Sequence, residues 1–236
     1  MHAWPTSRAE AMSIQHDLRQ RVIVGGNSRP PETIAAVETA YGHEGREVYA
    51  AVVVVSFPEL RVIERAYYHR SADFPYVAGL FYFREGPAMI GALARIKSEV
   101  DVLIVHGHGI AHPNGVGIAS CIGLAFARSS IGCARRLLVG YHRKVGDRKG
   151  STETIFMNSQ PVGLAYRSRD SVKPIFISPG YNCNIEQAGS IIVQCLRGYR
   201  LPEPSRIAHA AANKFRRTRE RDLQEFTADQ QRTPTS

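Results

Sequence analysis

The chain has 236 residues and is 44% hydrophobic, which is enough to bury a substantial core in one large domain. Its formal net charge of +9 favours a polyanionic partner through counterion release, although basic surfaces also occur on proteins that bind no nucleic acid. The apolar runs are too short for a membrane span and the four single cysteines form no CxxC pair, which argues against membrane-spanning, zinc-cluster and disulfide-framework proteins.

Residues 1–30 are predicted to form an N-terminal arm at the periphery of the fold. A helix is expected over residues 9–22, and the Gly-Gly and Pro-Pro pairs that follow it break any regular element. The N-terminus lacks the apolar core of a signal peptide, so we expect a cytoplasmic protein.

The main domain is predicted over residues 31–204 and opens with three strands. Residues 34–41, 48–56 and 60–68 are rich in Val, Ile and Tyr and are separated by turn-like segments, which predicts an antiparallel meander. Glu38 lies inside the first strand, where a carboxylate is costly unless it is paired or bound to a cation.

A loop and a helix follow the meander. The loop, residues 74–79, carries Tyr76 directly after a proline, where the ring either packs or stacks on a base. An apolar stripe predicts a helix that runs to about residue 98. Glu85 stands near its start, where the helix dipole favours an acidic residue, so its position needs no functional explanation on its own.

The centre of the chain is a short apolar strand over residues 102–105 that leads into a glycine-rich loop. This loop holds His106, His108 and His112. In an α/β protein, a glycine-rich loop at the carboxyl end of a buried strand is a typical place for a site, because glycine lets a ligand approach the backbone. We therefore place the site here, with the histidines either as ligands or as ordinary loop residues.

The remaining elements complete a mixed sheet. A helix over residues 116–128 and a strand over residues 130–134 form a parallel βαβ unit with the central strand. Two strands, a helix and a basic tail are expected at residues 161–169, 173–178, 184–199 and 205–236. The tail is predicted as a solvated helix that ends in flexible residues. The fold class is α/β, with a mixed central sheet flanked by helices in the ribonuclease-H-like pattern.

Six motifs in order resemble the endonuclease V family. They are YAAVVVVSFPE at residues 49–59, GIAHPNGVGIAS at 109–120, GYRLPEP at 198–204, and shorter matches at 74–79, 83–87 and 178–180. That family recognises deaminated bases, chiefly hypoxanthine, and cuts one phosphodiester bond on the 3′ side with magnesium. The resemblance implies deaminated DNA or RNA as the partner, a role in DNA repair or RNA metabolism, a Mg or Mn cofactor and a monomer.

The positions that match the family's catalytic residues depart from its pattern. The family's first-strand aspartate is Glu38 here, and its second metal aspartate is His106, within His-Gly-His-Gly where the family has Asp-Gly-Gln-Gly. The family's lysine after Gly-x-Ala is Arg135, and its histidine after Ser-Pro-Gly is Tyr181. Glu85 is the metal carboxylate that remains.

The resemblance assigns roles to eight residues of this chain. The metal positions are Glu38, Glu85 and His106, which with Arg135 form the catalytic set, and the substrate-binding set is Tyr76, Gly79, His112, Arg135 and Tyr181. Magnesium demands near-octahedral oxygen coordination and seldom accepts histidine, so these substitutions predict a weak or lost magnesium site.

Three hypotheses follow for the function. The first is a divergent homologue that binds nucleic acid, with its cleavage lost or altered. The second is an active endonuclease with a remodelled site for manganese or another transition metal, in which Glu38, Glu85, His106 and also His108 are ligands. The third is an interaction protein that uses the same fold without nucleic acid.

Overall fold

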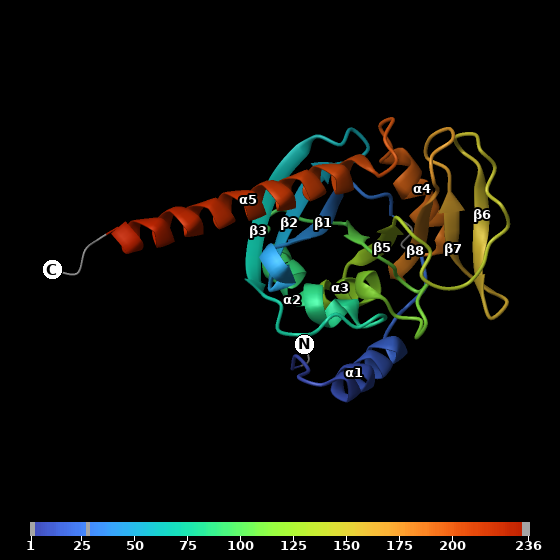
Figure 1. Ribbon diagram of the computed structural model, residues 1–236. Coiled ribbons are helices and arrows are strands. Elements are labelled where there is room, and N and C mark those ends of the chain that lie inside the picture. The colour runs from blue at the N-terminus through green and yellow to red at the C-terminus, as the bar shows by residue number, and fades with distance from the viewer. Residues whose placement is uncertain (1–2, 27–28, 233–236) are drawn as a thin grey trace.

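The computed structural model describes residues 3–26 and 29–232, with the side chains of residues 223–232 left aside. Eight strands form one sheet: β1 (Thr33–Tyr41), β2 (Glu47–Ser56), β3 (Val62–Ser71), β4 (Val102–His106), β5 (Ser129–Ala134), β6 (Thr152–Met157), β7 (Gln160–Tyr166) and β8 (Ile175–Tyr181). Their order across the sheet is β3-β2-β1-β4-β5-β8-β7-β6 (Figure 1). The helices are α1 (Arg8–Gln20), α2 (Phe81–Leu93), α3 (Ile118–Phe126), α4 (Ile185–Gln194) and α5 (Glu203–Arg232), with a short 3-10 turn at His43–Gly45.

The strand directions confirm the predicted mixed sheet. β1, β2 and β3 form the antiparallel meander. β4 runs parallel to β1, with Ile34 opposite Val102, and β5 runs parallel to β4. The parallel pairs bring the carboxyl ends of β1, β4 and β5 to one edge, where the loops after parallel strands build sites.

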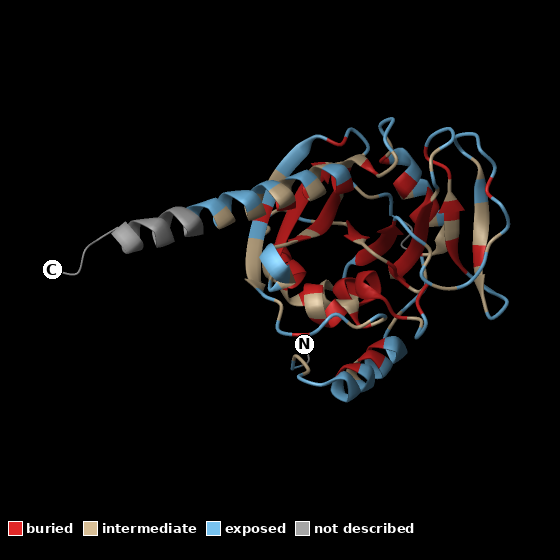
Figure 2. Cartoon of the chain, viewed as in Figure 1, coloured by how far each residue is buried: buried red, intermediate tan, exposed pale blue. Residues whose placement is uncertain are grey.

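Helices cover both faces of the sheet, so its central strands are buried on both sides (Figures 1 and 2). Ala35 and Val37 of β1 pack with α2 and α3, whereas the alternate residues Ile34 and Ala36 pack with α4 and α5. Side chains alternate between the faces of a strand, so Glu38 projects toward α5. None of the helices within the described ranges is long and apolar enough to cross a membrane.

Two elements, β6 and α2, differ clearly from the sequence-based expectation. β6 was not predicted, because its residues are only partly buried and it is an edge strand. α2 begins at Phe81 rather than near Pro87, so Pro87 and Glu85 lie inside it. Burial of Tyr82, Phe83 and Met89 outweighs the cost of about 3 kcal/mol that an internal proline imposes on a helix.

The two ends of the chain pack more closely than expected. The arm predicted as peripheral contains α1, whose Ala11, Gln15 and Leu18 are buried. The tail predicted from residue 205 begins inside α5, where Ala208 and Ala212 are buried against the sheet. α5 then continues away from the body of the protein (Figure 1). The domain boundaries themselves remain a prediction.

Candidate functional site

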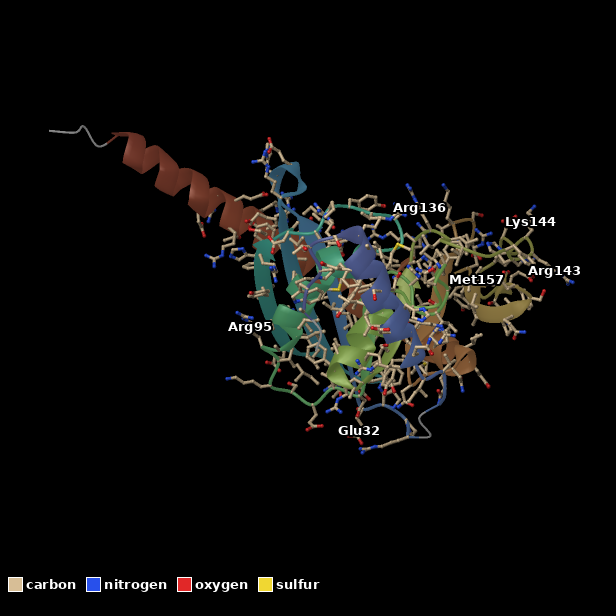
Figure 3. The ribbon with its side chains drawn as sticks, turned by 90° about the horizontal axis from the view of Figure 1, so that it is seen from below. Glu32, Arg95, Arg136, Arg143, Lys144 and Met157 are labelled. Atoms are coloured by element: carbon tan, nitrogen blue, oxygen red, sulfur yellow. The ribbon has the colours of Figure 1, made fainter. Side chains whose placement is uncertain are left out.

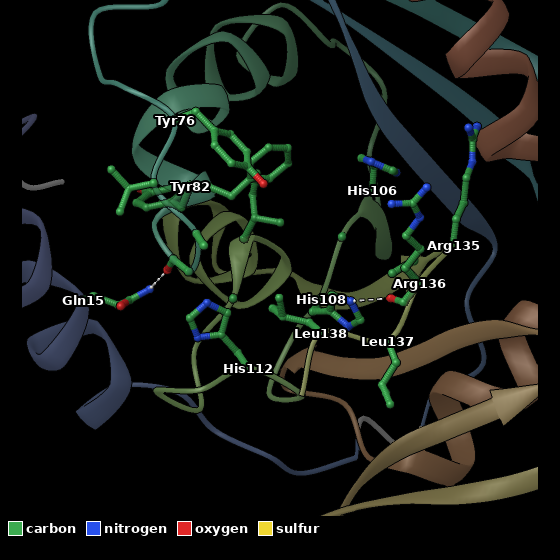
Figure 4. A pocket seen from close by; sticks show the side chains of 18 residues that line it. Gln15, Tyr76, Tyr82, His106, His108, His112, Arg135, Arg136, Leu137 and Leu138 are labelled. Atoms are coloured by element: carbon green, nitrogen blue, oxygen red, sulfur yellow. Dashed lines mark hydrogen bonds between the residues drawn. The ribbon is translucent and has the colours of Figure 1, made fainter. Parts of the chain in front are cut away.

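A pocket of about 380 Å³ lies at the carboxyl ends of β4 and β5. Its walls come from the loop before α2, the histidine loop after β4 and the segment after β5 (Figure 4). Of the predicted site residues, it brings together Tyr76, Gly79, His106, His112 and Arg135. Tyr181 does not line this pocket; it lies at the end of β8, beside Gly123 of α3.

Two histidines of the pocket are buried and neutral at neutral pH. His108 is 8% exposed and His112 is 4% exposed, and burial lowers the pKa of each to about 4. His108 Nε2 lies 3.0 Å from the carbonyl oxygen of Arg136, to which it donates (Figure 4). His112 Nδ1 accepts from the backbone N–H of Asn114 at 3.2 Å. His108 therefore serves as a neutral link between two walls of the pocket.

The rim of the pocket carries an exposed aromatic ring. The Tyr76 side chain is 72% exposed and meets Phe81 edge to face. Gly79, at the other end of this loop, has φ of +81°, a conformation that favours glycine. A Cβ on Gly79 would lie 3.8 Å from the ring of His112, so the Tyr76 loop and the histidine loop pack closely.

Gln15 of α1 joins these two loops, and sequence reasoning missed it. The side chain is 1% exposed, and its Nε2 donates to the carbonyl of Gly79 at 2.8 Å and to that of Val116 at 3.3 Å. Its Oε1 accepts from Asn114 Nδ2 at 2.7 Å. The signal for it in the sequence is weak. Gln15 is a polar residue on the apolar face of a predicted helix, and the local sequence does not show whether such a side chain is buried or solvated.

Glu38 lies between two imidazoles at the edge of the sheet. Its side chain is 4% exposed, and its Oε2 is 3.8 Å from His106 Nδ1 and 3.5 Å from Nδ1 of His209, which α5 supplies. Sequence reasoning missed His209, a histidine on a helix turn that otherwise carries small residues. In both contacts Nδ1 faces the carboxylate, so the Nε2 atom of each ring points away from Glu38.

Glu85 approaches this region from the other face of the sheet. It lies on α2, is 1% exposed and accepts a hydrogen bond from the Thr39 hydroxyl at 2.7 Å. Burial raises the pKa of Glu85, and this hydrogen bond opposes that effect. Thr39 and Glu38 are neighbours on β1 and therefore face opposite sides of the sheet.

These donors do not fit a magnesium centre. Within the described ranges, no group of three or more His, Cys, Asp or Glu side chains is placed to hold a metal ion. One of the three predicted metal positions, His106, offers an imidazole, and the two carboxylates belong to opposite faces of the sheet. Magnesium requires near-octahedral oxygen ligands at about 2.0 to 2.1 Å. The metal role of Glu38, Glu85 and His106 therefore stays a prediction.

Sequence and structure both match known proteins. The family model described as Endonuclease V matches residues 16–210. An Endonuclease V from Roseiflexus sp. (strain RS-1) is 43% identical, over 90% of this chain and 95% of the relative. The crystal structure of Endonuclease V from Streptomyces avermitilis has a TM-score of 0.84 at 32% identity, covering 95% of this chain and 96% of that one. A Ciona intestinalis Endonuclease V, in complex with a 24mer DNA containing an inosine followed by a ribo-adenosine, shares the fold with a TM-score of 0.78 at 24% identity, covering 91% of this chain and 98% of that one.

Proposed function

The chain belongs to the endonuclease V family and has its ribonuclease-H-like fold, and from that premise we propose that it binds nucleic acid containing a deaminated base while its magnesium-dependent cleavage is lost or altered. The observation that carries this proposal is the placement of the carboxylates. Glu38 faces α5 between two imidazoles, and Glu85 is held by Thr39 on the other side of β1. Phosphodiester cleavage by a metal-dependent nuclease needs the ion to activate water and to stabilise the leaving oxygen.

The chemistry of the pocket supports binding of a neutral base. Enzymes that act on a single base take it out of the stack into a pocket, where they bind it by hydrogen bonds and stacking. His108 and His112 are neutral because burial lowers the pKa of each to about 4, so they line the pocket without adding a charge, and Nδ1 of His108 has no hydrogen-bond partner among the described residues. Phe81 and Tyr82 contribute apolar wall, and Tyr76 on the rim is exposed for stacking or for insertion between bases.

The surroundings of the pocket support phosphate binding. Arg135 and Arg136 are exposed where they line its edge. A guanidinium binds two phosphate oxygens at once, so an arginine at the position of the family's lysine keeps the cation needed for the backbone. Such contacts release counterions, and the affinity must therefore fall as salt rises.

The first test is binding and nicking of inosine-containing DNA and RNA, in parallel reactions with magnesium, with manganese and with a chelator. We expect salt-sensitive binding in all three and no product with magnesium. Tyr76→Ala should reduce the preference for inosine over the unmodified strand, whereas Tyr199→Ala, which removes another exposed tyrosine outside the pocket lining, should not. Robust nicking with magnesium would contradict the proposal.

The manganese reactions test the second hypothesis. The two imidazoles within 4 Å of the Glu38 carboxylate favour it, since carboxylate with imidazole suits softer ions. Product that appears with manganese and disappears in Glu38→Gln and Glu85→Ala would establish a remodelled nuclease. Binding that is absent or independent of salt would instead favour an interaction protein without a nucleic-acid partner.

A further inference from the structure

A basic segment leads from the pocket toward the far edge of the sheet. Arg135 and Arg136 begin it and Arg143 and Lys144 end it, and all four residues are exposed. The one acidic residue between positions 135 and 151 is Asp147, which forms an ion pair with Arg167. Figure 3 shows Arg136, Arg143 and Lys144 along one side of the molecule, which they share with Met157 of β6. The segment therefore extends the positive edge of the pocket.

An exposed tyrosine stands in the middle of this segment on a rigid support. Tyr141 exchanges two backbone hydrogen bonds of 2.9 Å with Phe156 of β6, and the two rings stack with centroids 6.0 Å apart. The side chain of Tyr141 is nevertheless 62% exposed. Gly140 has φ of +80°, and a Cβ there would lie 2.3 Å from the carbonyl oxygen of Phe156. Glycine thus lets the segment lie directly on β6 with the outer face of the Tyr141 ring free.

The segment is also fixed at both ends. Near the pocket, the carbonyl of Arg136 accepts from His108, and the carbonyl of Arg135 accepts from Arg200 at 2.7 Å. Past Lys144, Arg167 donates to the carbonyl of Val145 at 3.0 Å. These anchors use backbone carbonyls and leave the four cationic side chains free for a ligand, so binding would cost little ordering of the backbone.

Cations that alternate with an exposed ring match one class of partner. Proteins that bind single-stranded nucleic acid combine a positive groove, which follows the phosphates, with aromatic rings on which bases stack. The backbone of a duplex would use the cations but leave the Tyr141 ring idle, because its bases are stacked on one another. Leu138, which lines the edge of the pocket and is 43% exposed, adds apolar surface for an unpaired base.

We propose that residues 135–144 form a track for one nucleic-acid strand leaving the pocket, with a base stacked on Tyr141 and phosphates bound by Arg143 and Lys144. The proposal rests on the proposed function, since the strand enters the track from the pocket. The track is a second contact region. It makes the affinity depend on the length of the strand and on whether it is single or double, and not on the identity of the base in the pocket.

The test measures binding by the full chain with fluorescence anisotropy. It compares a short single-stranded oligonucleotide centred on inosine, the same one extended on both sides, and the extended one annealed to its complement. Tyr141→Ala should weaken binding of the long strand roughly tenfold and leave the short one unchanged, whereas Tyr141→Phe should retain the affinity. The double variant Arg143→Ala with Lys144→Ala should reduce the slope of log affinity against log salt by about 1.4 for the long strand.

The matched control removes two arginines from the opposite edge of the sheet. Arg61 and Arg65 are exposed beside or on β3, and replacing both by alanine removes the same charge far from β6. This control should keep the slope of the unaltered protein.

The outcomes separate the two proposals. If the unaltered protein binds neither oligonucleotide, the proposed function fails. If it binds both but Tyr141→Ala leaves the long strand unaffected, the track is refuted while the pocket stands. If the Arg143 and Lys144 variant loses as much affinity for the duplex as for the single strand, the preference for a single strand is refuted.

Discussion

Replacing Gln15 by leucine should loosen both loops that form the pocket. The leucine has a similar size but leaves the Gly79 carbonyl and the Asn114 amide without the bonds of 2.8 and 2.7 Å that they now make. Gly79 is half-buried and keeps a hydrogen bond from His112, and Asn114 is exposed, so water replaces part of these two bonds. The buried carbonyl of Val116 also loses its bond of 3.3 Å, and leaving one buried partner unsatisfied should lower the free energy of unfolding by roughly 1–3 kcal/mol. For a chain of this size, 1 kcal/mol shifts Tm by about 2–4 °C.

Thermal unfolding and affinity for inosine-containing oligonucleotide test this prediction together. We expect Gln15→Leu to lower Tm by roughly 2–12 °C and to weaken binding, because Gly79 and the histidine loop lose their common anchor. Gln20→Leu is the matched control, since Gln20 is an exposed residue of the same helix whose amide contacts His16. Equal Tm and equal affinity for the two variants would refute the assigned role of Gln15.

Three further predictions concern buried groups. The pKa of His108 and His112 is about 4 in the folded protein, against 6.5 for the unfolded chain, so between these values the unfolded state binds more protons. The free energy of unfolding should therefore fall as pH drops from 6.5 to 4, by up to about 1.4 kcal/mol per pH unit for each histidine. Urea titrations at several pH values should show that this free energy depends less steeply on pH in His112→Asn. Gly109→Ala should destabilise the fold by about 3 kcal/mol or more, because its Cβ would lie 1.8 Å from the Pro179 carbonyl oxygen. The control is Gly25→Ala, whose Cβ would have its nearest neighbour 3.7 Å away, and it should unfold like the parent protein in the same urea titration. Burial raises the pKa of all four free cysteines, so a thiol reagent should modify them slowly in the native protein and quickly in denaturant; fast native labelling would contradict their burial.

The sequence by itself determined most of the strands of the sheet and pointed to the loop that lines the pocket. Runs of Val, Ile and Tyr with turn residues between them predicted β1 to β3, and small residues predicted α3 and the parallel unit around it. The glycine-rich loop after β4 predicted the pocket. These signals are local, since each depends on neighbouring residues and on the period of a strand or helix. Where local signals were weak or misleading, as at the half-exposed edge strand β6 and at Pro87 inside α2, prediction failed.

Only the tertiary structure decided which side chains meet. The period of β1 shows that Glu38 and Thr39 face opposite sides, but not that α5 covers one side and α2 the other. Packing of the helices on the sheet brings His209 to Glu38 and holds Glu85 at Thr39, so the two carboxylates bind partners on opposite sides of β1. Packing of α1 likewise brings Gln15 to Gly79 and Asn114. Such contacts join residues far apart in the chain, and they follow from the burial of whole helix faces rather than from any local pattern.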